Sequence, residues 1–289
     1  MAIIINENTN VLVMGMTGKQ GAFHTRQMLD YGTKIVAGTS PGKGGAIVEG
    51  VPAYDSVREA CANHRIDASV VFVPAGGTKD AALESIEAGI GVVVIITEGV
   101  PVDDEIELVA HAKRRGAIVL GPNTFGIVSS GKCKMGIPPN KYFVEGPVGV
   151  VARSGTLTYE IVGNLTASGL GQSTVVGMGG DRVVGTTFID VLKMFEKDPL
   201  TKAVVLIGEI GGNAEETASE YIKTMSKPVV GYIAGKSAPP GKRMGHAGAI
   251  IERGKGTFQG KVEALTAAGA KVATLPFEVP GLIKEMLGM

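Results

Sequence analysis

Short apolar runs alternate with amphipathic helical patterns along nearly the whole chain, and this alternation constrains the fold more than any other feature. In the first half, runs rich in β-branched residues fall at 11–14, 34–37, 68–73, 92–96 and 117–120. Helical patterns such as KDAALESIEAG and EIELVAHAKRRG separate several of these runs. Continuous apolar strands that alternate with helices predict a parallel sheet covered on both faces.

The same pattern restarts in the second half of the chain. Its apolar runs fall at 148–152, 173–176, 203–207, 228–233 and 271–274. The turn-rich residues 123–147 between the halves are expected to be a connection. We therefore predict an α/β protein with two doubly wound domains, 1–122 and 148–289. Its 43 glycines and 5% aromatic content suit many tight strand-to-helix turns.

Composition excludes several classes of function. The 28 basic and 28 acidic residues give a formal charge of +0, so no basic surface for nucleic acid is expected. No run of about 20 apolar residues is available to span a bilayer, and the first residues, MAIIINENTN, do not resemble a signal peptide. Cys61 and Cys133 form no recognisable pair, which favours a reducing compartment. We expect a cytoplasmic protein that binds neither nucleic acid nor membrane.

The turn between the first strand and the first helix carries glycines in a GxxGxxG spacing at Gly15, Gly18 and Gly21. Such a loop lets backbone N–H groups approach a phosphate, although a plain tight turn can have the same spacing. The second strand lacks the acidic residue that usually holds the ribose of NAD. Lys43 follows it instead, and a cation there suits an additional phosphate, as in NADP or coenzyme A, or is simply solvated. Residues 96–98 end a later strand at the same sheet edge.

Three polar groups follow strands of the second half. Ser154 opens the turn Ser-Gly-Thr before a helix, which suits either capping or phosphate binding. Glu209 ends an apolar strand, where a carboxylate needs a partner unless it lies at the surface. His246 lies between glycines in the loop after the next strand. A parallel sheet would bring all three to one edge.

His246 could act as a nucleophile that carries a covalent phosphoryl group, with Glu209 holding its other ring nitrogen. A structural or solvent-exposed histidine is the alternative. The remaining histidines, His24, His64 and His111, form no metal-ligand cluster, so no metal site is predicted. The Gly235-Lys236-Ser237 tripeptide lacks the first glycine of a P-loop.

These motifs resemble the α subunit of succinyl-CoA synthetase (succinate–CoA ligase) along essentially the whole chain. The matching segments are GMTGKQGAFHTRQML, YGTKIVAGTSPGKGG, IITEGVP, RSGTLTYE, GEIGGNAEE, GYIAG and GKRMGHAGAII. The resemblance implies an N-terminal Rossmann-like CoA-binding domain followed by a flavodoxin-like ligase domain. It also implies the reaction of succinate, CoA and ATP or GTP to succinyl-CoA, nucleoside diphosphate and phosphate.

The resemblance further assigns roles to individual residues. His246 would be the phosphorylated histidine and Glu209 its partner. Phosphate and substrate would meet Ser154, Gly155, Thr156 and Tyr159. CoA would contact Thr17, Gly18, Lys19, Gln20, Lys43, Ile96, Thr97 and Glu98. The nucleotide and Mg²⁺ would belong to a separate β subunit, in an αβ or (αβ)₂ assembly.

Two positions depart from the family pattern. Phe125 stands where the family commonly has proline, and Gly76-Gly77 stands where it often has a bulkier pair. Because a changed loop can change which dicarboxylate fits, malate–CoA ligase is an alternative. An NADP-dependent oxidoreductase would leave the histidine loop without a role. A non-catalytic CoA-binding regulatory module would bind CoA without being phosphorylated.

Overall fold

The computed structural model of the protein describes residues 2–239, 241–252 and 254–289. Its strands are β1 (Val11–Met14), β2 (Ile35–Thr39), β3 (Ile47–Val48), β4 (Val51–Tyr54), β5 (Ala68–Val71), β6 (Val92–Ile95), β7 (Ile118–Leu120), β8 (Gly126–Ser129), β9 (Cys133–Gly136), β10 (Glu145–Ala152), β11 (Gln172–Gly177), β12 (Ala203–Glu209), β13 (Val229–Ala234) and β14 (Lys271–Ala273). Its helices are α1 (Lys19–Asp30), α2 (Val57–Asn63), α3 (Ala75–Glu87), α4 (Val102–Arg115), α5 (Gly155–Ala167), α6 (Phe188–Lys197), α7 (Ala214–Ile222), α8 (Phe258–Ala267) and α9 (Val279–Leu287), with 3₁₀ turns η1 (Asn140–Tyr142) and η2 (Pro276–Glu278).

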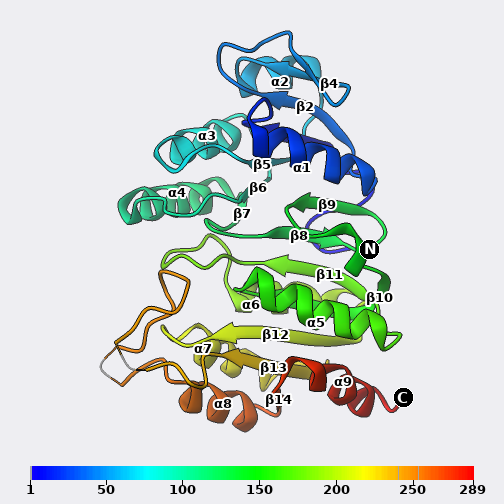
Figure 1. The fold of residues 1–289 in the computed structure, drawn as a ribbon, viewed down its shortest axis with the longest axis vertical. Coiled ribbons are helices and arrows are strands. Elements are labelled where there is room, and N and C mark those ends of the chain that lie inside the picture. The colour runs from blue at the N-terminus through cyan, green and yellow to red at the C-terminus, as the bar shows by residue number, and fades with distance from the viewer. Residues whose placement is uncertain (1, 240, 253) are drawn as a thin grey trace.

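The strands form two sheets, which lie one after the other along the long axis of the molecule (Figure 1). The first has the order β3-β4-β2-β1-β5-β6-β7, and the second has the order β14-β13-β12-β10-β11-β8-β9. The interior of each is parallel, as predicted. Each half of the sequence therefore forms one sheet with a parallel interior and helices around it, which confirms the expected α/β fold class.

Helices cover both faces of each sheet because the strands are apolar on both faces. In β10, Val148 and Val150 pack in a cluster with residues of α5 and α9, whereas Val151 packs with residues of α6 and α7. Likewise Val13 of β1 shares a cluster with residues of α1, and Leu12 shares one with residues of α3 and α4. Side chains alternate between the two faces of a strand, so near-continuous apolar runs were the correct signal for buried strands.

The segment 123–147, expected to be a connection, contains two strands that the sequence analysis missed. β8 and β9 form an antiparallel hairpin, and β8 also pairs antiparallel with β11, so the hairpin extends the second sheet toward the first. Both strands are short and glycine-flanked, and Lys134 lies within β9, so no apolar run marks them. The domain bounds proposed from the sequence stay a prediction, although this hairpin clearly belongs with the second sheet.

The hairpin also joins the two halves. Thr33, which follows α1, donates a side-chain hydrogen bond to the Lys134 backbone oxygen at 2.7 Å and accepts one from the Lys134 N–H at 3.0 Å. Met28 of α1 lies in the same buried cluster as Met135 of β9. One hydrophobic core therefore runs from the first sheet into the second. Among the residues that the structure describes, no helix is long and apolar enough to cross a membrane.

Candidate active site around His246

Three adjacent parallel strands bring the site together. β10 ends just before Arg153 and Ser154, β12 ends with Glu209, and the loop after β13 carries His246 (Figure 1, orange). Because β10, β12 and β13 are neighbours and run in the same direction, their carboxyl ends share one edge of the sheet. Ligands of open α/β sheets bind at this edge.

The imidazole of His246 is held by a carboxylate. Its Nδ1 lies 2.7 Å from Oε2 of Glu209, whose side chain is 8% exposed. The hydrogen bond to Glu209 raises the pKa of His246, against burial, which acts to lower it. In the neutral ring Nδ1–H donates to Glu209, so the lone pair is placed on Nε2. The geometry is that of an oriented histidine nucleophile.

Arg153 supports Glu209 from the other side. Its Nε lies 3.4 Å from Oε1 of Glu209, and its side chain is 9% exposed. Its Nη2 donates to the backbone oxygen of Asp181 at 2.8 Å. A buried carboxylate is costly unless it is paired, and Arg153 and His246 are the two partners that Glu209 has among the described residues.

The loop that follows β11 forms the seat of the imidazole. A Cβ at Gly180 would lie 2.5 Å from Cγ and Cδ2 of His246, so only glycine leaves room for the ring. The N–H of Gly248 donates to the Gly180 oxygen at 3.4 Å. Nε of Arg182 donates to the Ala247 oxygen at 3.5 Å. The histidine loop is therefore held directly after His246, at Ala247 and Gly248.

A cavity of about 310 Å³ opens beside the histidine. Its lining residues come from both halves of the chain: Ile96, Glu98, Asn123, Thr124, Phe125, Ile137, Arg153, Ser154, Gly155, Thr156, Tyr159 and His246. Phe125 and Tyr159 pack edge to face with ring centroids 5.9 Å apart. Burial raises the pKa of the Tyr159 hydroxyl, so it stays protonated. The cavity is thus lined by an aromatic pair and by the imidazole of His246.

The start of α5 faces this cavity and can hold an anion. Ser154 occupies the N-cap position, but its side chain makes no capping hydrogen bond. The sequence analysis considered Ser154 as a cap, and the structure shows the position without that bond. The first backbone N–H groups of a helix have no partner within the helix, and they carry the positive end of its dipole. Gly155 and Thr156, in that first turn, line the cavity.

The other candidate CoA residues lie at the carboxyl edge of the first sheet. Thr17 and Gly18 are exposed in the turn before α1, Lys19 and Gln20 are exposed at its start, and Lys43 is exposed after the neighbouring strand β2. Thr17 N–H donates to Ser40 Oγ at 3.2 Å, which links the two turns. None of these five residues lines the 310 Å³ cavity, whereas Ile96 and Glu98 do. Thr97 instead anchors the loop, because its hydroxyl donates to the Val73 oxygen at 2.6 Å.

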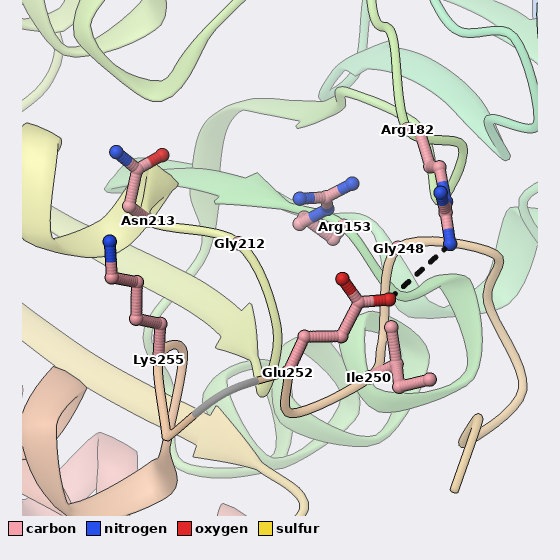
Figure 2. A pocket seen from close by; sticks show the side chains of 8 residues that line it. All are labelled: Arg153, Arg182, Gly212, Asn213, Gly248, Ile250, Glu252 and Lys255. Atoms are coloured by element: carbon pink, nitrogen blue, oxygen red, sulfur yellow. Dashed lines mark ion pairs between the residues drawn. The ribbon is translucent and has the colours of Figure 1, made fainter. Parts of the chain in front are cut away.

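A second hollow, of about 720 Å³, is also lined by Arg153 (Figure 2). Its lining residues are Arg153, Arg182, Gly212, Asn213, Gly248, Ile250, Glu252 and Lys255. Figure 2 shows Glu252 directed toward Arg182, and Nη2 of Arg182 lies 3.7 Å from Oε1 of Glu252. Arg153 therefore lines both hollows, and the histidine loop contributes His246 to the first and Gly248 and Ile250 to the second.

Sequence reasoning missed Arg153, Gly180 and Asp181. Arg153 could have been found by the argument that identified Glu209, because it too is a charged residue directly after a buried strand. Gly180 and Asp181 carried no comparable signal in an irregular loop. No group of three or more His, Cys, Asp or Glu in the described part of the chain is arranged to hold a metal ion.

Comparisons with known proteins give two family matches along the chain. Residues 6–99 match the CoA binding domain family, and residues 151–271 match the CoA-ligase family. The chain is 60% identical to subunit alpha 2 of the ADP-forming succinate–CoA ligase of Archaeoglobus fulgidus, over 99% of this chain and 100% of that one. It is 57% identical to the alpha subunit from Methanothermobacter thermautotrophicus, over 99% of this chain and 98% of that one.

A solved structure shows the same fold at lower identity. ATP citrate lyase from Methanothrix soehngenii, in complex with citrate and coenzyme A, superposes with a TM-score of 0.92 at 26% identity. The match covers 99% of this chain and 51% of that one, so the chain spans about half the length of this structural relative. With full-length relatives well above half identical, the chain belongs to the family of succinate–CoA ligase α subunits.

Proposed function

We propose that the chain is the α subunit of an ADP-forming succinate–CoA ligase that works through a phosphohistidine at His246. The overall reaction joins succinate and CoA and converts ATP to ADP and phosphate. The observation that carries this proposal is that His246, held by Glu209 at 2.7 Å, lines one cavity together with the N-terminus of α5. A nucleophile and an anion site are the two parts that phosphoryl transfer needs.

The chemistry follows from the placement of these groups. Nε2 of His246 attacks a phosphoryl group and forms an N–P bond while the nucleoside diphosphate leaves. Glu209 stabilises the positive charge that develops on the imidazole. A carboxylate oxygen of succinate then attacks the phosphoryl group, which gives succinyl phosphate and frees His246. The N–H groups of Gly155 and Thr156 hold the phosphoryl oxygens during this step.

In the second half of the reaction, the CoA thiolate attacks the acyl carbon of succinyl phosphate and phosphate leaves. We assign the CoA phosphates to the turns with Thr17–Gln20 and Lys43, which present the exposed start of α1 and two exposed lysines. Glu98 and Ile96 lie where the thiol end would enter the cavity. In this proposal the nucleotide and Mg²⁺ bind to a β subunit, in an αβ or (αβ)₂ assembly.

The acid is proposed to be succinate, and Phe125 makes this a point to test. Phe125 is 4% exposed, lines the cavity and packs against the ring of Tyr159. Malate differs from succinate by one hydroxyl, and an apolar wall discriminates weakly against an added hydroxyl. Both free cysteines, Cys61 and Cys133, are consistent with the proposed cytoplasmic location.

A labelling experiment tests the function. The complex with its partner subunit would be incubated with γ-labelled ATP or GTP and Mg²⁺. We expect acid-labile, base-stable label on this chain, absent in His246→Asn and discharged by succinate plus CoA. Discharge by malate plus CoA alone would change the assigned substrate. If the intact complex took up no label, a CoA-binding module without catalysis would be the better account.

A further inference from the structure

Two buried carboxyl groups meet where the halves of the chain join. Glu105 of α4 is 2% exposed, and Asp181 of the loop after β11 is 4% exposed. The carboxyl groups of the two residues lie close enough to interact with each other. Oε2 of Glu105 also accepts a hydrogen bond from the Val183 N–H at 3.3 Å. The first half of the chain thereby reaches the loop that seats His246.

This pair needs a proton. Oδ1 of Asp181 accepts from the side-chain amide of Asn123 at 3.0 Å, whereas its buried Oδ2 receives no protein donor among the described residues. Two ionised carboxylates in such a place would repel each other, and a single shared proton removes the repulsion. Burial, followed by the hydrogen bond to Asp181, raises the pKa of Glu105 to about 7. Glu105 is therefore the donor at neutral pH and below.

The charged groups around the pair have other partners. Arg153 gives its Nη2 to the backbone oxygen of Asp181, not to the carboxylate. Lys79 of α3, the helix that packs on α4, is held by Asp104 at 2.8 Å and by Glu107 at 3.0 Å. The proton on Glu105 is thus the group available to satisfy Asp181 Oδ2.

The loop that this pair fixes holds His246 at several points. Gly180 lies against the imidazole, and its oxygen accepts from the Gly248 N–H. Arg182 holds the Ala247 oxygen and the Glu252 carboxylate, the latter visible as the dashed line in Figure 2. A shift of this loop would move the ring relative to Glu209.

We infer that Glu105 is a positioning residue for His246, because the proton that it shares with Asp181 fixes the Gly180–Val183 loop on which the imidazole is seated. This inference rests on the proposed role of His246 as the phosphoryl carrier. Glu105 touches no reacting atom and acts through Asp181 and Gly180. The first half of the chain thus contributes to phosphoryl transfer as well as to the proposed binding of CoA.

The test compares Glu105→Leu and Glu105→Gln in the complex with the partner subunit. Leucine removes the donor, and we expect the rate of His246 phosphorylation to fall between about 10-fold and about 100-fold, because small misplacements of a reacting group have effects of this size. Glutamine keeps the shape and an N–H donor, so its rate at pH 7 should stay near that of the wild type. The KM for CoA should not change in either variant. Glu107→Gln, the same change at an exposed position of α4, is the matched control and should behave as the wild type.

The pH dependence of the phosphorylation rate distinguishes the shared proton from a merely structural role, because a structural role would leave that dependence unchanged. In the wild type, the phosphorylation rate should decline as the pH rises through about 7, where Glu105 loses its proton. Glu105→Gln cannot titrate and should lack this decline. The inference is overturned if Glu105→Leu is as fast as the wild type, if it changes only the KM for CoA, or if Glu105→Gln keeps the decline. Should Glu105→Leu fail to fold, Glu105→Gln decides alone.

A thermal unfolding series separates this inference from the proposed function. Because the folded pKa of Glu105 lies above its ordinary value, the folded state binds more protons between the two values. The stability that protonated Glu105 contributes is complete below the ordinary pKa of a glutamate and is lost as the pH rises through about 7. As the pH is raised from 5.5 to 8, the unfolding temperature of the wild type should decrease relative to that of Glu105→Gln. Without label on His246 the proposed function fails, yet this difference still tests the shared proton; a constant difference would refute it.

Discussion

At the scale of single residues, we expect the Glu209 carboxylate to set the reactivity of His246 in the proposed phosphoryl transfer. In Glu209→Gln the charge is lost, so the pKa of His246 should fall and the developing imidazolium should be less stable. We expect phosphorylation to slow by about 100-fold, a range typical for a lost electrostatic partner at a reacting group. The rising limb of the pH–rate profile, where His246 loses its proton, should move to lower pH.

Glu220→Gln supplies the control for this change. Glu220 lies on α7 in an exposed ion pair with Lys223 and touches no part of the site. Its phosphorylation rate and pH profile should equal those of the wild type. A Glu209→Gln variant whose rising limb stays in place would show that Glu209 does not hold the imidazole in solution.

Gly180 is the second residue at which the structure predicts the effect of a substitution on phosphorylation. In Gly180→Ala the new methyl group would meet the imidazole ring at 2.5 Å, so the ring has to leave its place against Glu209. Phosphorylation should fall at least about 10-fold while the fold is kept, since the clash concerns one side chain of a surface-reaching loop. Circular dichroism and labelling, measured on the same preparation, check both parts.

Gly76→Ala is the matched control for Gly180→Ala. Gly76 lies in α3, and a Cβ there would meet nothing within 4 Å. Alanine in a helix should leave activity unchanged and stabilise the protein by about 0.5–1 kcal/mol. Equal labelling of Gly180→Ala and Gly76→Ala would show that the seat does not fix the ring.

At the scale of elements, a buried ion pair joins α8 to α7 beneath the end of β12. Lys261 of α8 and Glu215 of α7 are fully buried and paired, and Lys261 also lies 3.0 Å from Glu216. Oε1 of Glu215 accepts from the backbone N–H of Glu209 at 3.1 Å. The ion pair therefore helps to fix the residue that holds His246.

Lys261→Met should be strongly destabilising, because it leaves the Glu215 carboxylate buried without a cation. Breaking a buried pair in this way costs about 3–5 kcal/mol. The free energy of unfolding in urea measures the loss. Lys223→Met, which removes the exposed pair of α7, should have little effect. If both variants were equally stable, α7 and α8 would not depend on this pair.

At the scale of the whole molecule, the two sheets share one buried cluster through α1, β8 and β9. We therefore expect both halves to unfold in one transition, and CoA bound to the first half should stabilise the second. At a concentration of about 100 times its Kd, CoA should raise the free energy of unfolding by about 2.7 kcal/mol. Hydrogen exchange should show added protection in β12 and β13 as well as in β1.

Two separate transitions, with CoA shifting only the first, would contradict this expectation. The variant Thr33→Val offers a control, because it removes the hydroxyl bond to Lys134 between the halves and leaves the exposed CoA turns alone. It should weaken the coupling without weakening CoA binding. The decrease in coupling between the two halves in this variant then measures how much the contact with the β8–β9 hairpin contributes to that coupling.

The sequence by itself determined the two parallel sheets and the edge at which the site lies. Strands that are apolar on both faces, such as those at 92–96 and 203–207, are fully buried only when helices cover both faces of the sheet. Strand order then puts the ends of β10, β12 and β13 side by side. Ser154, Glu209 and His246 could be named from the sequence because each follows such a run, where a polar side chain stands out against an apolar background.

Only the tertiary structure decided what surrounds those residues. Arg153, Gly180, Asp181 and Glu105 meet around His246 from segments far apart in the chain, and no local pattern records such contacts. Any side chain at Gly180 would clash with the ring of His246, which lies 66 residues later in the chain, and this proximity exists only in the folded protein. The β8–β9 hairpin likewise owes its place to packing on α1 and β11 and not to its own short strands. Local periodicity reports how a segment is buried, whereas the contacts that tune a site depend on which segments are buried together.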